Sequence, residues 1–310
     1  MTRVAMVGRA GVLKRLAQEL PLRDSSLEVV GLPTPEQADD AEVVVGWNLH
    51  DGTLSHFPRV RLVHSPAAGC DHLLNDTSLP GNVPVCRVVD PAQREGMTAF
   101  VSWAVLHYQR RLDEVLRNER DHHWEMPVQL PLSDTQVGVL GLGQFGGHAA
   151  SQLARLGLSV RGWARSPRQL EGVECFHGNS QLGSFLEGLD ILICLLPLTP
   201  ETQGILNISL FRQMAPGGVV INLGRGSHLV VDDLLQALDE GHLRAALLDV
   251  FDQEPLPQDS ALWSDPRVTV TPHMASAACI EAMVEQIVAN IQRLEKGEPL
   301  INQVDRTGGY

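Results

Sequence analysis

The chain of 310 residues is long enough for two domains, and its composition of 44% apolar and 20% charged residues is ordinary for a soluble globular protein. No apolar run approaches the roughly 20 residues that span a bilayer, which excludes a membrane-spanning protein. The formal net charge of −13 disfavours nucleic acid and anionic membranes as partners, because both require clustered lysine and arginine.

The first third of the chain alternates short Val- and Leu-rich runs with polar stretches and helical patterns. This alternation is typical of an α/β protein with a parallel sheet. The first run is interrupted by Gly8 and Arg9, so we interpret it as a strand and a turn, not a secretion signal. We therefore expect the mature chain to begin with this strand. The predicted strands are residues 3–8, 27–32, 42–47, 60–65 and 85–89.

The pattern then changes to helical spacing. Apolar residues between 97 and 116 recur every three or four positions, which predicts one long amphipathic helix connecting two domains. A stripe over residues 280–294 predicts a last helix that crosses back to the first domain. Between them lie six further predicted strands, enough for a complete doubly wound sheet: residues 135–141, 159–164, 189–196, 217–223, 245–251 and 268–273.

The stretch "GLGQFG" joins the first strand of this second series to a helix. Gly141, Gly143 and Gly146 have the spacing that a dinucleotide site requires: one glycine for the turn, one for the pyrophosphate and one for helix packing. The alternative is a glycine turn that only packs a helix on a sheet. The preceding strand and following helix favour the nucleotide site, because the helix N-terminus faces the phosphates.

The next strand ends at the residues that decide between the two nicotinamide cofactors. An acidic residue there would bind the ribose 2′-hydroxyl of NAD. This chain has Arg165, Ser166 and Arg168, which suit a phosphate monoester. The sequence therefore predicts NADP(H) as the preferred cofactor with NAD(H) possible, the alternative being a solvated basic loop.

Four reactive side chains follow the last three strands. Arg225 follows one strand, Asp249 and Glu254 the next, and His273 the last. Taken alone, each of these residues is more simply explained as a surface or core residue than as a catalytic one. Because ligands of open α/β sheets bind beyond the carboxyl ends of the strands, their joint placement favours a catalytic site.

Four motifs in this order, "GLGQFG", "INLGRG", "LDVFDQEPLP" and "TPHMAS", resemble the D-isomer-specific 2-hydroxyacid dehydrogenases over nearly the whole chain. The closest resemblance is to the bacterial glyoxylate/hydroxypyruvate reductases of the A type, through "GWARS", "DVFDQEPLPQDSALW", and "LEKGEP" followed by "QVDRTGGY". It implies a flavodoxin-like substrate domain (residues 1–98 and 276–310) and a Rossmann cofactor domain (residues 99–275), each with a doubly wound parallel sheet. An active-site cleft is expected between them.

The reaction assigns roles to these residues. Reduction of a 2-oxo acid needs a proton donor, for which we assign His273. Glu254 is its partner, because a carboxylate favours the protonated imidazole and fixes its tautomer. Arg225 is expected to hold the substrate carboxylate and polarise the carbonyl. By resemblance, Asp249 meets the nicotinamide side.

The binding residues complete the predicted site. Gln144, Phe145, Leu196 and Pro197 are expected to join the glycine motif in holding the cofactor. By resemblance, the backbone amides of Ala68 and Gly69 grip the substrate carboxylate and Trp47 lines the pocket, together with Arg225 and His273. Ala67 stands where relatives commonly carry glycine. The alternatives are a simple turn at 65–70 and a packing role for Trp47.

Metal and disulfide chemistry are not indicated. The sequence has no HExxH motif, and the adjacent His122 and His123 turn apart on any regular element, so we expect a metal-free site. Five scattered cysteines without a CxxC pair fit a reducing cytoplasm.

The resemblance predicts an NADPH-preferring reductase of small 2-oxo acids, converting glyoxylate to glycolate and hydroxypyruvate to D-glycerate. Trp124 lies in a segment that reaches across a dimer interface in related reductases, so we expect a homodimer, with local packing of Trp124 as the alternative. A dehydrogenase of another 2-oxo acid is the nearest alternative function. A nucleotide-sensing scaffold, like the C-terminal-binding co-repressors, comes from a different class. A formate or phosphite dehydrogenase is disfavoured by "GWARSPR".

Overall fold

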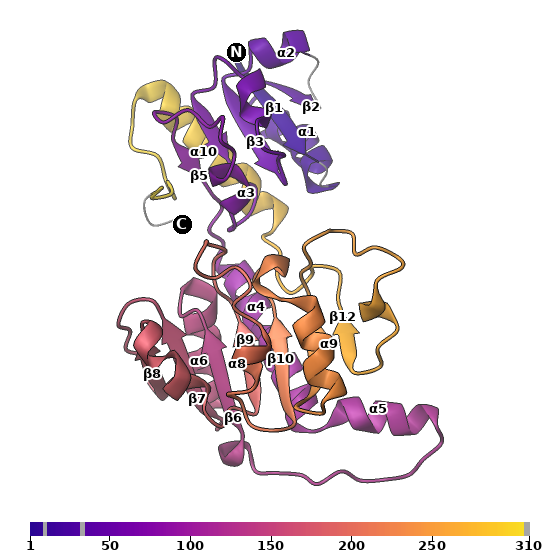
Figure 1. Ribbon diagram of the computed structural model, residues 1–310. Helices are drawn as coiled ribbons and strands as arrows, with labels where there is room; N and C mark the ends of the chain where they lie inside the picture. The colour runs from indigo at the N-terminus through magenta and orange to yellow at the C-terminus, as the bar shows by residue number, and fades with distance from the viewer. Residues whose placement is uncertain (9–10, 32–34, 307–310) are drawn as a thin grey trace. The chain divides into compact units, whose positions relative to one another are not determined.

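The computed structural model describes residues 1–8, 11–31 and 35–306 (Figure 1). The chain divides into two compact units, residues 1–93 with 277–310 and residues 94–276. Leu32, at the end of a predicted strand, and residues 307–310 of the tail lie outside the described residues. Among the helices of the described part, none combines the length and apolar character needed to cross a membrane.

The first unit is a parallel sheet with helices on both faces (Figure 1). In the described residues its strand order is β2-β1-β3-β4-β5, the flavodoxin-like order. The elements are β1 (Thr2–Gly8), α1 (Gly11–Arg23), β2 (Leu27–Gly31), α2 (Pro35–Asp39), β3 (Val43–Trp47), η1 (Thr53–His56), β4 (Leu62–His64), α3 (Asp71–Leu74), β5 (Val85–Cys86) and α10 (Ile280–Lys296).

The apolar runs of this sheet are explained by burial on both faces. Val43 and Val45 of β3 pack on the side of α1 and α10, whereas Val44 packs on the opposite side with η1 and α3. All three valines are fully buried. A strand covered on both sides is apolar at successive positions, which is why these strands read as continuous Val and Leu runs.

The second unit is a larger parallel sheet in the Rossmann order, β12-β11-β10-β9-β6-β7-β8 over the described residues. Its elements are α4 (Pro91–Gln109), α5 (Leu112–Arg120), η2 (Leu132–Asp134), β6 (Gln136–Leu140), α6 (Gln144–Arg155), β7 (Ser159–Ala164), β8 (Val173–His177), η3 (Asn179–Gln181), α7 (Leu182–Leu186), β9 (Ile191–Cys194), α8 (Ile208–Phe211), β10 (Gly218–Asn222), η4 (Gly226–His228), α9 (Val231–Asp239), β11 (Leu243–Leu248), η5 (Ala261–Trp263) and β12 (Val268–Val270).

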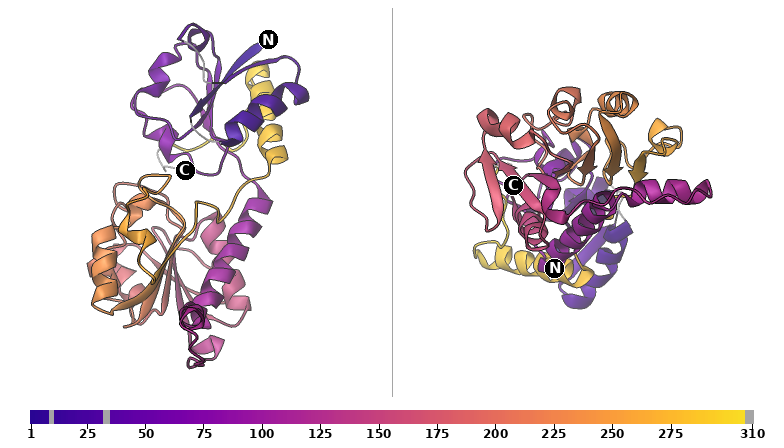
Figure 2. Two further views of the ribbon diagram at one scale, coloured as in Figure 1. Left: turned by 90° about the vertical axis from the view of Figure 1, so that its right-hand side faces the viewer. Right: turned by 90° about the horizontal axis from the view of Figure 1, so that it is seen from below.

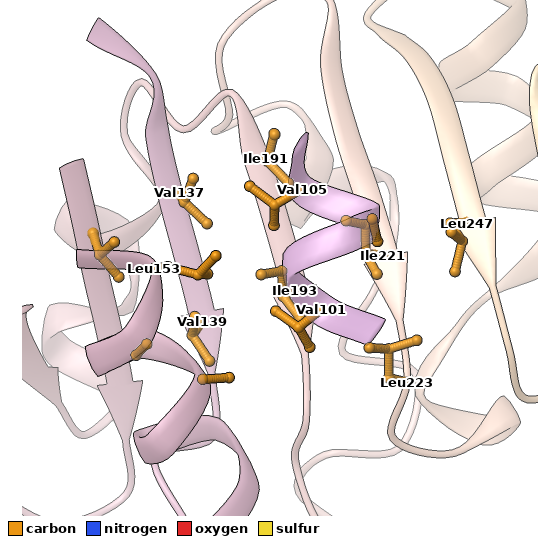
Figure 3. Close-up of a cluster of buried hydrophobic side chains, with 14 of the residues drawn as sticks. Val101, Val105, Val137, Val139, Leu153, Ile191, Ile193, Ile221, Leu223 and Leu247 are labelled. Atoms are coloured by element: carbon orange, nitrogen blue, oxygen red, sulfur yellow. The ribbon is translucent and has the colours of Figure 1, made fainter. Parts of the chain in front are cut away.

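Alternate residues of the central strands pack into two hydrophobic cores, one on each face of the sheet. Figure 3 shows Val101 and Val105 of α4 over Ile193 and Ile221, in a core that α6 also covers. Leu192 points to the other face, which α7, α8 and α9 cover. The resulting burial fixes the register of each strand, because a shift of one residue would exchange its two faces.

One strand of this sheet was not predicted. The six strands expected from the sequence all have counterparts, but β8 adds a seventh at the edge, where it pairs with β7. No residue of β8 is fully buried. Its pattern is weak because an edge strand without burial needs no apolar run.

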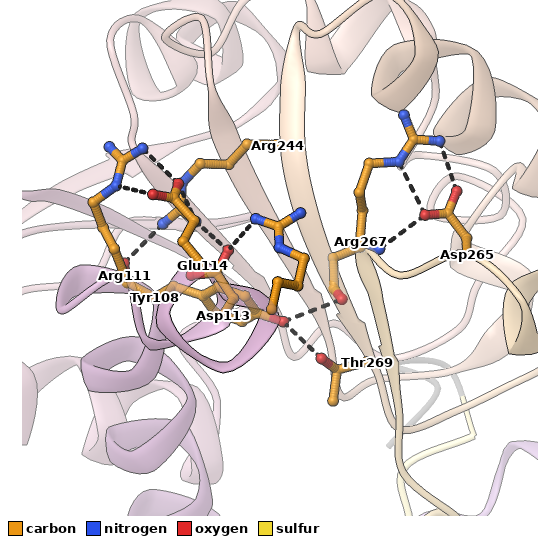
Figure 4. A network of polar contacts seen from close by, with 10 residues as sticks. Tyr108, Arg111, Asp113, Glu114, Arg244, Asp265, Arg267 and Thr269 are labelled. Atoms are coloured by element: carbon orange, nitrogen blue, oxygen red, sulfur yellow. Dashed lines mark hydrogen bonds and ion pairs between the residues drawn. The ribbon is translucent and has the colours of Figure 1, made fainter. Parts of the chain in front are cut away.

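The long helix predicted over residues 97–116 is wrong as a single element. It divides into α4 and α5 at Arg111, whose φ of 55° is left-handed. In a continuous helix the carbonyl of Tyr108 would accept from Leu112. Instead the N–H of Arg111 donates to that carbonyl at 3.0 Å and Nη2 of Arg244 at 2.7 Å. Nη1 of Arg244 also donates to Asp113 at 2.6 Å, which ties the break to β11 (Figure 4).

Beyond this anchor, α5 and the chain after it extend away from the sheet of the second unit (Figure 2). No residue of α5 is buried. Trp124 is 100% exposed and Met126 is 83% exposed. We call α5 with residues 121–131 the arm.

Candidate active site

The glycine-rich turn lies between β6 and α6. A Cβ at Gly146 would come within 1.8 Å of the carbonyl oxygen of Gly141, so only glycine fits there, and Gly141 has a φ of +99°. At Gly143 an added Cβ would meet no atom within 4 Å. Gly143 caps α6 without a side-chain hydrogen bond, which leaves backbone N–H groups of the first turn for an anion. This donor set fits a dinucleotide pyrophosphate.

The basic residues predicted at the end of β7 are exposed. Arg165 and Ser166 follow Ala164 directly at the carboxyl end of the strand, and Arg168 comes two residues later. The pKa of Glu201 is lowered by its own backbone N–H, by the Thr199 hydroxyl and by the charge of Arg165. Arg165 is therefore close to the loop that follows β9.

The end of β9 adjoins the glycine turn. The carbonyl carbon and oxygen of Leu195 lie within 2.8 Å of where a Cβ on Gly141 would be. Leu196 is buried, and the exposed Pro197 follows it. Gln144 is also exposed and Phe145 half-buried, at the start of α6. These predicted cofactor residues therefore flank one turn.

The candidate acid is a histidine paired with a carboxylate. Nδ1 of His273 lies 2.8 Å from Oε2 of Glu254, and the backbone N–H of Phe251 donates to Oε1 at 3.0 Å. Burial raises the pKa of Glu254, but the hydrogen bonds from His273 and Phe251, with the charges of His273 and Arg225, lower it below its usual value. Glu254 is thus a carboxylate at neutral pH.

Asp249 holds the segment that carries His273. Its side chain is 1% exposed and accepts hydrogen bonds from the Thr271 hydroxyl at 2.6 Å and the N–H groups of Met274 and Ala275 at 2.9 Å each. These donors lie on both sides of His273, whose φ of 52° is left-handed. The expected contact of Asp249 with the nicotinamide stays a prediction, whereas its contacts with this segment are direct.

The Arg225 segment packs against the Glu254 segment. A Cβ on Gly226 would lie 1.9 Å from the carbonyl carbon of Phe251, so glycine is required for this approach. The hydroxyl of Ser227 donates to Asp252. The electrostatic effect of Arg225 on Glu254 agrees with this packing. Arg225, Glu254 and His273 are therefore brought together beyond three neighbouring strands, β10, β11 and β12.

The predicted substrate loop lies in the first unit, after β4. The carbonyl oxygens of Ala67, Ala68 and Gly69 accept hydrogen bonds from Val88, Arg87 and Ser65. Among the described residues, no hydrogen bond uses the N–H groups of Ala68 or Gly69. Two adjacent backbone donors are therefore available on this loop.

Trp47 ends β3 in the same unit. Its ring packs edge-on against His72 with centroids 4.8 Å apart. It is half-buried and contacts the core that α1 and α10 cover. A packing contact is thus present, and the role of Trp47 in a pocket stays a prediction.

Comparison with known proteins identifies the family. Residues 102–275 match the NAD binding domain of the D-isomer specific 2-hydroxyacid dehydrogenases. A glyoxylate/hydroxypyruvate reductase A of Serratia proteamaculans is 42% identical over 87% of this chain and 88% of its own length. An NADPH-dependent glyoxylate/hydroxypyruvate reductase of Sinorhizobium meliloti, solved with NADP and sulfate, superposes with a TM-score of 0.89 at 34% identity, covering 100% of both chains. A D-isomer specific 2-hydroxyacid dehydrogenase family protein of Klebsiella pneumoniae reaches 0.92 at 40% identity, over 99% of this chain and 98% of that one.

The chain belongs to the D-isomer-specific 2-hydroxyacid dehydrogenase family. This dehydrogenase is therefore an NAD(P)-dependent oxidoreductase, and the resemblance inferred from its four motifs is confirmed. Among the described residues of this dehydrogenase, no group of three or more His, Cys, Asp or Glu side chains is arranged to bind a metal ion.

Sequence reasoning missed the side chains that support this site. Asn222 and His228 are both 0% exposed and contact the backbone of Arg225, and Thr271 contacts Asp249. The available signal was a polar residue three positions before Arg225 and another three positions after it. That pattern has no fixed chemical meaning without the fold, because polar residues after a strand are usually exposed.

Proposed function

We propose that this dehydrogenase is an NADPH-preferring reductase of small 2-oxo acids, which reduces glyoxylate to glycolate and hydroxypyruvate to D-glycerate. The names of its relatives support this substrate class. The observation that carries the proposal is the pairing of His273 with Glu254 beside Arg225, because reduction of a carbonyl needs a proton donor and a cation for the substrate carboxylate.

His273 donates the proton to the carbonyl oxygen. Its Nδ1–H is directed to Glu254, so the transferred proton is on Nε2. Glu254 fixes this tautomer and balances the charge of the protonated ring. Arg225 binds the substrate carboxylate with its forked donors. The reduced nicotinamide, when bound, supplies the hydride that converts the carbonyl carbon to the alcohol carbon.

The cofactor is held by residues from four strand ends, those of β6, β7, β9 and β11. The N–H groups at the start of α6, beside Gly141, Gly143 and Gly146, bind the pyrophosphate. Arg165, Ser166 and Arg168 bind the 2′-phosphate, which accounts for a preference for NADPH while NADH stays usable. Further cofactor contacts come from Gln144, Phe145, Leu196, Pro197 and Asp249.

The first unit serves as the substrate domain and the second as the cofactor domain. The N–H groups of Ala68 and Gly69 are suited to a second contact with the substrate carboxylate. Trp47 forms an aromatic wall that favours small substrates. The predicted domain boundaries, after residues 98 and 275, differ from those of the two units, which lie after residues 93 and 276.

The arm mediates a homodimer. Trp124, Met126 and Val128 are large apolar side chains with exposed fractions of 74% or more, and such surfaces usually bind a partner. Light scattering after gel filtration should give twice the chain mass, and Trp124→Ser with Met126→Ser should give the monomer. A monomeric wild-type protein would contradict this part of the proposal.

The proposed enzyme works in the cytoplasm without a metal. The five cysteines are all free in the structure, which is consistent with a reducing compartment. Dialysis against EDTA should leave turnover unchanged. Loss of activity that a divalent cation restores would show that this expectation is wrong.

A substrate panel with both cofactors tests the function. Absorbance at 340 nm should fall when glyoxylate or hydroxypyruvate is added to enzyme and NADPH, and kcat/KM should be at least about tenfold higher with NADPH than with NADH. Arg165→Gln should narrow that ratio, and Arg155→Gln on α6 is the matched control. Preference for a bulkier 2-oxo acid would indicate another dehydrogenase of the family. If the protein binds NADPH but oxidises it with none of the 2-oxo acids, the result would indicate a nucleotide-sensing scaffold.

A further inference from the structure

Two buried side chains hold the backbone of Arg225 from opposite sides. The side-chain amide of Asn222 donates to the carbonyl oxygen of Arg225 at 2.9 Å. Nδ1 of His228 accepts from the N–H of Arg225 at 3.1 Å. Both Asn222 and His228 are 0% exposed. The polar groups on each side of the Arg225 Cα are thereby fixed, which sets the direction of its Cα–Cβ bond, and Nη1 of its guanidinium donates to the carbonyl oxygen of Gly224 at 2.8 Å.

The hydrogen bonds of His228 define its protonation state. Nε2 lies 3.2 Å from the carbonyl oxygen of Pro197, which can only accept, so Nε2 carries a hydrogen. The N–H of Arg225 can only donate, so Nδ1 carries none. The ring is a neutral imidazole with its single proton on Nε2, and it does not act as an acid toward substrate.

The ring connects two parts of the site. Nδ1 contacts Arg225 and, at 3.7 Å, the Cys194 thiol, and Nε2 contacts Pro197, which follows β9 and belongs to the proposed cofactor site. A Cβ on Gly224 would lie 2.9 Å from Nδ1 of His228 and 3.1 Å from the carbonyl oxygen of Leu196. Gly224 therefore permits the close approach of the ring to both segments.

We infer that His228 is a positioning residue, which directs Arg225 toward the substrate carboxylate and at the same time holds Pro197 against the cofactor. The inference rests on the proposed function, because it concerns the substrate and cofactor of that site. A misplacement of about 1 Å in a binding group can lower turnover about 100-fold, so the orientation of Arg225 is a sensitive quantity.

Two conservative variants separate the two contacts. Asparagine can place an oxygen near the position of Nδ1, so His228→Asn retains an acceptor for Arg225 and loses the donor to Pro197. Glutamine can place an amide nitrogen near Nε2, so His228→Gln retains the donor and loses the acceptor. We expect His228→Gln to weaken binding of oxalate to the enzyme with NADP⁺ by about tenfold, with the Kd for NADPH changed less than twofold. We expect His228→Asn to raise the Kd for NADPH several-fold and to affect oxalate less.

Calorimetry for oxalate and fluorescence titration for NADPH give these constants without turnover. If both variants change the two constants in parallel, or change neither, the positioning role is wrong. If wild-type enzyme binds oxalate and NADPH but reduces no 2-oxo acid, the proposed function fails while the binding constants still test His228.

A double-mutant cycle tests whether His228 acts through Arg225. In the Arg225→Ala background, His228→Gln should cause no further loss of oxalate affinity. An additive loss would overturn the inference. If the His228 variants do not fold, Asn222→Ala removes the donor to the Arg225 carbonyl, together with the acceptor for the Gly224 N–H, and adds no charge. It should weaken oxalate and leave the NADPH Kd unchanged, and unchanged oxalate affinity would also overturn the inference.

Discussion

The two segments that carry Arg225 and His273 are held in different ways. Residues 222–228 are held by neutral side chains of the same segment, Asn222 and His228. Residues 271–275 are held by the carboxylate of Asp249, which lies 22 to 26 positions earlier, directly after the neighbouring strand β11. The first arrangement is local in sequence and uncharged, and the second is non-local and anionic.

This difference follows from the backbone that each segment needs. Arg225 has an extended conformation, with φ −142° and ψ 152°, that any residue adopts, so neutral hydrogen bonds suffice. His273 has a left-handed φ of 52°, which is costly for a residue with a Cβ. Hydrogen bonds to an ionised carboxylate are stronger than neutral ones, at about 1.5–3 kcal/mol each, and three of them stabilise this conformation.

The largest expected effect is the loss of turnover on substitution of His273, whose segment Asp249 holds. His273→Gln removes the proton donor, so kcat should fall by about 100- to 10,000-fold, the range for general acid catalysis. The Kd for NADPH by fluorescence should stay within twofold of wild type. His56→Gln, an exposed histidine of the first unit, is the control and should retain full turnover. Substantial turnover by His273→Gln would refute the donor role.

Asp249→Asn tests the anionic support itself. The amide nitrogen would face the N–H of Met274 or of Ala275, so one hydrogen bond would become a repulsive contact. We expect kcat/KM to fall about 10- to 100-fold and the free energy of unfolding to fall by about 1–3 kcal/mol, measured by denaturant titration. Asp259→Asn at an exposed position is the control. Wild-type turnover and stability in Asp249→Asn would show that the charge is not needed.

Glu254→Gln tests the charge next to the His273 ring, whereas Asp249→Asn tests the charge that holds the backbone around His273. We expect about a tenfold loss of kcat, because glutamine still accepts the Nδ1 hydrogen bond but carries no charge. The lowered pKa of Glu254 means that its ionised form stabilises the fold above the ordinary value of 4.5, and that this contribution is lost as pH falls through the folded-state pKa.

The difference in free energy of unfolding between wild type and Glu254→Gln should therefore be largest above pH 4.5 and shrink below it. Urea titrations at several pH values measure this difference, with Glu171→Gln, an exposed glutamate, as the control. A difference that grows as pH falls would contradict the assigned direction.

The smallest effect on turnover is expected at His64, a buried imidazole of the first unit. Its Nδ1–H donates to the carbonyl of Ser65 at 2.7 Å, and its Nε2 accepts from Asn290 at 3.1 Å. Burial lowers its pKa from 6.5 to about 4. The unfolded chain therefore takes up a proton between these values when the folded chain does not, so stability falls as pH falls from 6.5 toward 4.

The lowering of the His64 pKa from 6.5 to about 4 corresponds to roughly 3 kcal/mol in the free energy of unfolding. Wild type should lose about that much more stability than His64→Gln between pH 7 and pH 4, measured by urea titration, while kcat/KM at pH 7.5 should differ by less than a few-fold. Equal pH dependence in the two proteins would contradict the lowered pKa.

The sequence predicted the strands well where burial left a strong pattern, and the structure brings the predicted Arg225, Glu254 and His273 together. Gly141 and Gly146 are required by contacts that only glycine permits, and Gly143 caps α6 with open space around it, so the spacing of the three was informative. The unburied edge strand β8 and the break between α4 and α5 left no such pattern. The break depends on Arg244, more than 130 positions away from Tyr108, and such a contact cannot be read from local periodicity.

The supporting side chains were hidden for a related reason. Asn222 and His228 hold backbone atoms, not ligands, so their residue types carry no motif of their own. Asp249 was predicted from the family to meet the nicotinamide, but its three hydrogen bonds to residues 271–275 depend on the pairing of β11 with β12. Such roles follow from the order of strands, which the sequence predicts only in outline.

The central claim is that Arg225, Glu254 and His273 act together on the carbonyl of a 2-oxo acid. A crystal structure of the enzyme with NADP⁺ and oxalate tests it most directly. We expect one oxalate carboxylate on the Arg225 guanidinium and an oxygen of the other within hydrogen-bond distance of Nε2 of His273, with Nδ1 of His273 still bonded to Glu254. Oxalate bound away from both side chains, or His273 turned away from Glu254 in the complex, would contradict it.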